Sequence, residues 1–364
     1  MRKEQKVDLF FELLRVVLGI IIAYIVCLVI IILLTGTEGW KDAVYNFAIG
    51  PYTSIRRFAQ VISRWAPYML VGCGMCFVYA SGRFSVISEG IINIAPIPIV
   101  LFMFMTNTMT GLPKIINLVI IMAACMLTGG VVSMIPAYGR EKLGANETVT
   151  SIILNIVCAY IGVSAIRNTI ANRALSFVAS PRYPDNMRFA RYWGNTNAHQ
   201  GIWVAVIGVI VACIIFYRTK LGVEIRIYGS NPVFAKYSGI NVRIIPFMGQ
   251  LLGGLFAGLA SCVEVFGAYD QYQLSMLTNI GMDGLLIAVM ARKQPIFVPL
   301  TAFVLASIRT SAAVLNTNTN IPVELVTMLQ AVIIFFVAAE GFLGRLRKRT
   351  IIRISKQQQA KEAR

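Results

Sequence analysis

LLRVVLGIIIAYIVCLVIIILL, residues 13–34, is a run of apolar residues that contains a single charge, Arg15. An α-helix needs about 20 such residues to cross the hydrocarbon core of a bilayer. The run is too long for the apolar core of a signal peptide, and no small-residue cleavage site follows it. It therefore predicts a first transmembrane helix that stays in the protein.

The rest of the chain has the same apolar character. Of its 364 residues, 57% are hydrophobic and 13% are charged, and the mean hydropathy is +0.72. Soluble domains carry about a quarter of their residues as Asp, Glu, Lys and Arg. Half that charge does not cover the surface of a water-soluble fold of this size. We expect an all-α integral membrane protein, a polytopic helical bundle.

The formal net charge of +17 has a topological explanation. Basic residues gather at the ends of apolar runs, where the positive-inside rule places them, so we expect membrane lipids and no nucleic acid as partners. The seven cysteines lie in or beside apolar runs, and the one histidine, His199, lies in a polar loop. This pattern predicts neither a metal site nor a disulfide framework.

Hydropathy and charge together predict about ten transmembrane segments with both termini in the cytoplasm. A short cytoplasmic N-terminus (1–12) precedes the transmembrane domain (13–343), and a basic cytoplasmic tail (344–364) follows it. The domain includes a polar outer loop (167–200), which carries five arginines that long outer loops tolerate, and a hydrophilic inner segment (218–243). The predicted spans are about 13–35, 60–81, 85–106, 114–137, 149–166, 201–217, 244–267, 277–291, 296–315 and 322–343.

The eighth predicted span is short, and a half-helix or a re-entrant segment is the alternative to a full crossing. Pro96 and Pro98 fall inside the third span and are expected to break or kink it. Broken helices in a membrane occur where they are buried or line a cavity, which favours a transport protein over a simple anchor. Four glycines at close spacing on the seventh span predict close helix approach: Gly249, Gly253, Gly254 and Gly258.

Polar side chains inside the predicted spans are candidates for a solute pathway, because charge in the membrane is costly. Glu89 has a second explanation, since a carboxylate near a helix N-terminus complements the helix dipole. An interhelical ion pair is the alternative for Asp283 and Arg309, and ordinary hydrogen bonding between helices is the alternative for the amides. The candidates are Glu89, Asn93, Asn155, Asp283, Arg309 and Gln330.

Motifs for catalysis are missing from the sequence. It contains no GxxxxGK[ST] phosphate-binding loop, no HExxH and no GxSxG. We expect a protein that is not an enzyme and binds no cofactor itself. A source of energy for transport must then lie in a partner or in an ion gradient.

The hydrophilic stretch LGVEIRIYGSNPVFAKYSGINV, residues 221–242, carries the most specific pattern. Asn231-Pro232 starts a turn or caps a new helix, which predicts a short helix from Pro232 to Tyr237. The stretch closely resembles the inner-face segment of bacterial ABC transporter permeases of the branched-chain amino acid and simple-sugar superfamily. The positions that match are Gly222, Arg226, Gly229, Asn231, Pro232, Ala235, Gly239 and Ile240.

Three further blocks resemble the same family: FSVISEGIINIA (84–95), GANETVTSIILN (144–155) and MDGLLIAVMARKQP (282–295). With SIRTSA (307–312) and IPVELVTMLQAVIIFFVA (321–338), the resemblance spans about residues 60–343. The last blocks are closer to the nucleoside-type branch than to the ribose-type branch. Ser85 and Ile91 depart from the family pattern near the presumed pathway, so the resemblance does not define the substrate.

The resemblance implies one of two permease subunits of an ATP-driven importer in the bacterial plasma membrane, carrying nucleosides or simple sugars. The implied partners are a cytoplasmic ATP-binding subunit, a second identical or related permease subunit and an extracellular substrate-binding protein. Segment 222–240 is then the coupling helix that meets the ATPase. The alternatives are a secondary transporter with Glu89 or Asp283 as its coupling carboxylate, and a membrane scaffold. A gradient-driven carrier needs no docking helix, so segment 221–242 favours the importer.

Overall fold

A computed structural model describes residues 44–106, 111–172, 177–194, 196–274 and 276–318, and the single residues 25, 28, 29, 41 and 175. The predicted first and tenth spans, and with them Gln330, lie outside these residues. The chain forms two units, one of which covers Tyr52–Ser307. The other includes the described residues 44–51 and 308–318, where Gly50 packs close to Val314.

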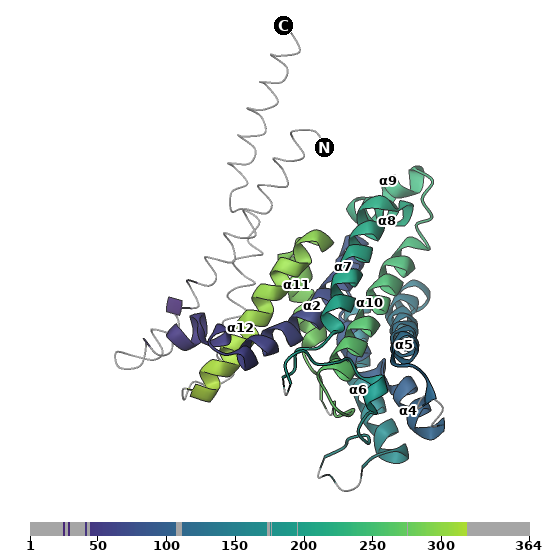
Figure 1. The fold of residues 1–364 in the computed structure, drawn as a ribbon. Coiled ribbons are helices and arrows are strands. Elements are labelled where there is room, and N and C mark those ends of the chain that lie inside the picture. Colours follow the sequence, from purple (N-terminus) through teal and green to yellow (C-terminus); the bar gives the residue numbers. More distant parts are fainter. Residues whose placement is uncertain are drawn as a thin grey trace. The chain divides into compact units, whose positions relative to one another are not determined.

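The unit Tyr52–Ser307 is built of helices (Figure 1), and its described residues hold no strand beyond an isolated bridge between Arg191 and His199. Seven helices in the described part of the chain are long and apolar enough to cross a membrane. The elements are η1 (Gly50–Tyr52), α2 (Ile55–Ala80), α3 (Ser88–Ile94), α4 (Ile97–Thr106), α5 (Lys114–Leu143), α6 (Glu147–Thr169), η3 (Asp185–Met187), α7 (Gly201–Arg218), α8 (Lys220–Ser230), α9 (Pro232–Tyr237), α10 (Ile245–Gly267), α11 (Ile280–Met290), η4 (Pro295–Phe297) and α12 (Val298–Asn318).

One of two helix boundaries follows directly from local sequence. The predicted third span is divided into α3 and α4 at Pro96, as the two prolines there predict. By contrast, α2 begins at Ile55, five residues before the predicted span. Arg56 and Arg57 lie in its first turn, so they belong to the helix although they do not belong to the apolar run.

Helix α10 lies at the centre of this unit and packs mainly against α5 and α2. Its glycines allow this contact, as their spacing predicts. A Cβ on Gly74 of α2 would lie 2.9 Å from the Gly253 carbonyl oxygen. A Cβ on Gly258 would overlap the Cys125 carbonyl group of α5. The three backbones are therefore in van der Waals contact, with no room for side chains between them.

The loop between α6 and α7 is held by ion pairs. Arg188 and Arg191 both bind Asp270, the latter with 2.6 Å between Arg191 Nη2 and Asp270 Oδ1. His199 is buried at the end of the loop, where its Nδ1 accepts a hydrogen bond from Gly201 N at 3.1 Å. Burial, with the nearby charge of Arg191, lowers the pKa of His199 to about 4. The arginines of this loop thus fold it against segment 268–279.

Candidate functional site

The α8–α9 pair is formed by two side-chain caps. Thr219 precedes α8 and its hydroxyl accepts a hydrogen bond from Gly222 N at 3.3 Å. Asn231 ends α8 and begins α9, and its Oδ1 accepts a hydrogen bond from Phe234 N at 3.0 Å. Pro232 occupies the first turn of α9, where its missing N–H costs nothing. The predicted short helix from Pro232 to Tyr237 is therefore confirmed.

Two glycines bring α8 into direct contact with the transmembrane helices. A Cβ on Gly229 would overlap the carbonyl oxygen of Ala80, the last residue of α2. A Cβ on Gly222 would overlap the Ile215 carbonyl oxygen of α7. Helix α8 also packs against α10, and at these two glycines it meets the backbones of α2 and α7 with no side chain between them.

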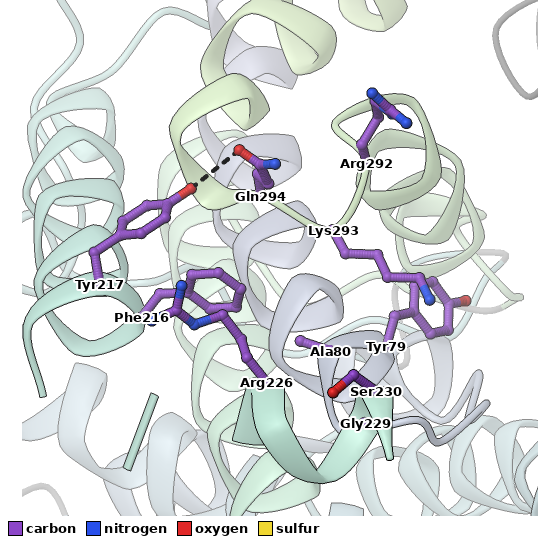
Figure 2. A pocket seen from close by; sticks show the side chains of 10 residues that line it. All are labelled: Tyr79, Ala80, Phe216, Tyr217, Arg226, Gly229, Ser230, Arg292, Lys293 and Gln294. Atoms are coloured by element: carbon purple, nitrogen blue, oxygen red, sulfur yellow. Dashed lines mark hydrogen bonds between the residues drawn. The ribbon is translucent and has the colours of Figure 1, made fainter. Parts of the chain in front are cut away.

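The other predicted residues of the segment divide into buried and exposed positions. Ala235 is fully buried, and Gly239 has a φ of 77°, a left-handed conformation that favours glycine. The Arg226 guanidinium lies 5.2 Å from the centre of the Phe216 ring and 5.7 Å from that of Tyr217, so it faces α7 (Figure 2). Asn231 and Pro232 are exposed.

Helix α9 also exposes large apolar side chains that the sequence pattern did not identify. Val233 and Phe234 are more than half exposed and Tyr237 is 86% exposed. Three such residues on a six-residue helix that is followed by a polar stretch are unusual for a solvated surface. Exposed apolar groups of this kind mark protein interaction sites. The sequence could have indicated these side chains, because all three are large apolar residues within a hydrophilic segment.

A buried charged cluster ties the neighbouring loops together. The Glu147 carboxylate, at the start of α6, lies 3.5 Å from Arg83 and 3.1 Å from Arg140. Glu147 Oε1 also accepts a hydrogen bond from Gln250 of α10, and Arg83 pairs with Glu141 as well. Glu147 is 2% exposed, so its charge depends on these partners. The cluster was missed because Arg83 and Gln250 approach Glu147 only in the folded chain.

Glu89 caps a helix, but not its own. It lies in the first turn of α3 and is 1% exposed. Its carboxylate accepts hydrogen bonds from Asn279 N and Gly281 N, both at 2.7 Å, and from the Thr278 hydroxyl at 3.0 Å. These donors form the N-terminus of α11, where a helix has unpaired N–H groups and positive partial charge.

The N-terminus of α11 lies against α3, with Ile280 and Gly281 buried and Asn279 exposed. The turn after α11 lines a pocket with the last residues of α2 and α7, which places the C-terminal end of α11 at one end of the bundle. An 11-residue helix rises about 16 Å, roughly half of the ~30 Å hydrocarbon core. Helix α11 alone is thus too short for a full crossing, and Glu89 meets its N-terminus.

Two asparagines among the candidates hold α3 in place. Asn155 of α6 accepts a hydrogen bond from Gly90 N at 2.8 Å and donates one to the Val86 carbonyl at 2.9 Å. The Asn93 side-chain amide donates a hydrogen bond to the Glu89 backbone carbonyl at 3.1 Å, and the Asn93 backbone carbonyl accepts one from the Tyr272 hydroxyl at 2.9 Å. Asn93 Oδ1 is buried and has no hydrogen-bond partner among the described residues.

The remaining charged candidates are not brought together by the described contacts. Asp283 is buried in the first turn of α11, and its Oδ2 accepts a hydrogen bond from the Tyr68 hydroxyl of α2. Arg309 belongs to the other unit of the chain, so its pairing with Asp283 stays a prediction. In the part of the chain that the structure describes, no three His, Cys, Asp or Glu side chains gather to hold a metal ion.

The fold and this arrangement define a multi-pass helical membrane protein of the transporter type. Residues 57–338 match the family described as branched-chain amino acid transport system / permease component. The match covers well over half of the chain, which therefore belongs to that family. It is a transport component rather than an enzyme.

Curated relatives agree with this family. The chain is 25% identical to the nucleoside ABC transporter permease protein NupB of Lactococcus lactis, covering 83% of each chain. It is 25% identical to the guanosine ABC transporter permease protein NupP of Bacillus subtilis, covering 82% of this chain and 87% of NupP. It is 25% identical to the glucose ABC transporter permease protein TsgB13 of Haloferax volcanii, covering 84% and 82%.

Proposed function

We propose that this chain is the permease subunit of an ATP-driven ABC importer for nucleosides in a bacterial plasma membrane. The similarity to NupB and NupP extends over more than four fifths of each chain, which supports a permease of their kind. A simple sugar is the alternative substrate, supported by the similarity to TsgB13. A nucleoside contains a sugar, so the two substrates share hydroxyl groups that a pathway can recognise.

The observation that carries the proposal is the α8–α9 pair. The ATP-binding partner subunit docks on the exposed apolar side chains of α9, and α8 passes its movement to the spans. The close approach of Gly229 to Ala80 and of Gly222 to Ile215 supports this transmission. Basic residues near this end, such as Arg218 and Lys293, favour a cytoplasmic position. We place both chain termini on the same side, because ten predicted crossings return the chain to the side on which it starts.

A second permease subunit, identical or related, completes the pathway, and an extracellular binding protein delivers the solute. Among the candidate pathway residues, Asn93 is the best placed to contact the solute. Its Oδ1 is a buried acceptor without a partner in the described residues, and nucleosides carry hydroxyl and amino donors. The carboxylate of Glu89 is instead fully engaged with backbone N–H groups.

The secondary-transporter alternative requires a carboxylate that takes up and releases a proton. The Glu89 carboxylate is held by three hydrogen bonds from residues 278–281. The Asp283 carboxylate likewise accepts a hydrogen bond from the Tyr68 hydroxyl. Fixed carboxylates of this kind support structural roles, and α9 has no purpose in a carrier driven by an ion gradient.

Replacing Tyr237 with Ser tests the docking role. An exposed aromatic that anchors an interface contributes about 2 kcal/mol or more to binding, or about thirtyfold in affinity. Tyr237→Ser should therefore weaken binding of the ATPase subunit and lower ATP-dependent uptake, with normal membrane insertion. Tyr192→Ser is the matched control, because Tyr192 is an exposed tyrosine of the loop between α6 and α7. Equal ATPase affinity in both variants and the wild type would contradict the proposed docking face.

A further inference from the structure

A pocket with three basic residues opens beside α8, at the end of the bundle that carries the coupling segment. Its volume is about 340 Å³, within the range of about 300–1,000 Å³ typical of small-molecule sites. It lies between the ends of α2 and α7, the last turn of α8 and the turn after α11 (Figure 2). The lining residues are Tyr79, Ala80, Phe216, Tyr217, Arg226, Gly229, Ser230, Arg292, Lys293 and Gln294.

The charge of this pocket is one-sided. Arg226, Arg292 and Lys293 line it, and no Asp or Glu does. In the described part of the chain, neither Arg226 nor Lys293 makes an ion pair. Arg226 lies against the Phe216 ring on one side of the pocket, while Lys293 extends toward Tyr79 on the other (Figure 2).

The turn that carries two of these cations has an unusual backbone. Arg292 and Lys293 have φ angles of 54° and 60°, in the left-handed region that glycine normally occupies. Arg292 N donates to the Val289 carbonyl at 2.9 Å and Lys293 N to the Ala288 carbonyl at 2.8 Å, the pattern of a Schellman C-cap. Helix α5 ends in the left-handed region with Gly144 instead.

A left-handed non-glycine residue costs roughly 1–2 kcal/mol. Glycine would end α11 without that cost, as it does for α5. Strained residues of this kind are typical of functional positions. Here the strained positions hold two basic side chains at the wall of an open pocket, which points to an anionic ligand.

We infer that this pocket binds a phosphate group. A guanidinium on an aromatic ring and an ammonium on the opposite wall suit phosphate oxygens, which accept charge-assisted hydrogen bonds. The pocket lies at the ends of α2 and α7, two helices long and apolar enough to cross a membrane, and basic pockets between such helices on the cytoplasmic side bind anionic lipid headgroups. The phosphate comes from an anionic phospholipid headgroup or from a soluble phosphate.

A bound phosphate group would connect two helices of the bundle, α8 and α11. Arg226 belongs to α8, which carries the coupling segment, and Lys293 follows the end of α11. Occupation of the pocket therefore fixes α8 relative to α11 and raises the stability of the permease. This inference concerns binding to the permease alone and does not depend on the transported substrate.

The test is thermal unfolding of the purified full-length permease in detergent. The probes are dioctanoyl phosphatidylglycerol, dioctanoylglycerol as the lipid without phosphate, and inorganic phosphate against chloride at equal ionic strength. The variant Arg226→Gln/Lys293→Gln removes two pocket cations. Lys236→Gln/Arg243→Gln is the matched control, because it removes one Lys and one Arg that are exposed outside the pocket.

We expect phosphatidylglycerol, inorganic phosphate or both to raise the unfolding temperature of the wild type and the control variant, while dioctanoylglycerol does not. A response to phosphatidylglycerol alone identifies a lipid headgroup, and a response to inorganic phosphate identifies a soluble source. The pocket variant should bind about a hundredfold more weakly, since each charge-assisted hydrogen bond contributes about tenfold.

No response in the wild type, or an equal response in the pocket variant, would overturn the inference. If the double variant does not fold, the single variant Lys293→Gln is used for the same binding test. Lys293 is exposed, so its replacement leaves the interior of the protein unchanged. It should weaken phosphate binding about tenfold, and unchanged binding would exclude the pocket.

Discussion

Replacing Glu89 with Ala should destabilise the protein, because Glu89 caps the N-terminus of α11. The change removes the acceptor for two backbone N–H groups, that of Gly281, which is buried, and that of Asn279, which is partly buried. Each orphaned buried donor costs about 1–3 kcal/mol, and loss of the charge at the helix N-terminus costs up to about 2 kcal/mol more. We expect a total loss of about 2–5 kcal/mol, by the same two principles, because only one of the two donors is fully buried.

The assay is thermal unfolding of the purified permease, with uptake measured on the fraction that stays folded. With an unfolding entropy of about 2.1 cal/mol/K per residue, 1 kcal/mol corresponds to about 1–2 °C in a chain of 364 residues, so the expected loss in unfolding temperature is roughly 3–7 °C. Ser88→Ala is the control on the same short helix, because it removes one hydroxyl–sulfur contact, from Ser88 Oγ to Met75 Sδ at 3.2 Å. That control should lose about 1 kcal/mol or less.

Glu89→Gln separates the structural role from a role in transport. It keeps one oxygen acceptor but turns an amide N–H₂ toward a backbone N–H, so its stability should lie between those of the wild type and Glu89→Ala. If Glu89→Ala unfolds at the wild-type temperature and yet abolishes uptake, the capping explanation is refuted. The carboxylate would then act on the solute or on a coupling ion.

Three further predictions concern other parts of the molecule. Gly229→Val should lower ATP-dependent uptake at least about tenfold while the protein still inserts, because its side chain overlaps the Ala80 carbonyl oxygen; normal uptake would show that α8 need not touch α2. The lowered pKa of His199, about 4 against 6.5, means that below pH 6.5 the unfolded chain binds a proton that the folded chain does not. Stability should then fall by up to roughly 3 kcal/mol as the pH drops from 6.5 toward 4, and His199→Asn should flatten this profile in thermal unfolding; an unchanged profile would assign it to other groups. Lys293→Gly should unfold at or above the wild-type temperature and Lys293→Val about 1 kcal/mol below Lys293→Gly, since only glycine suits the left-handed position; the reverse order would contradict strain in this turn.

Local signals in the sequence were sufficient where the structure depends on neighbouring residues. Asn231 and Pro232 define the start of α9 by a cap and a fixed φ, and both effects act within one turn. Pro96 divides the third span for the same reason. The glycines of α10 predicted a close contact because residues four positions apart lie on the same face of a helix, and this face packs against the neighbouring helices.

The partners of the site residues could be identified only from the folded structure. Glu89 was expected to complement a dipole or to face a solute, but its partners lie almost 200 positions further along the chain, and no spacing rule relates them. The cluster around Glu147 likewise joins residues of three different segments. The hydropathy pattern also located the start of the apolar run and not that of the helix, as Arg56 and Arg57 in α2 illustrate.

The most direct test of the account is uptake of labelled guanosine into proteoliposomes that contain this permease with its ATPase subunit and binding protein. We predict uptake that requires ATP, persists when ionophores collapse ion gradients and is lost when Asn231-Pro232 is replaced. Uptake of ribose alone would keep the importer and change the substrate. Uptake driven by an ion gradient without ATP would contradict the central claim.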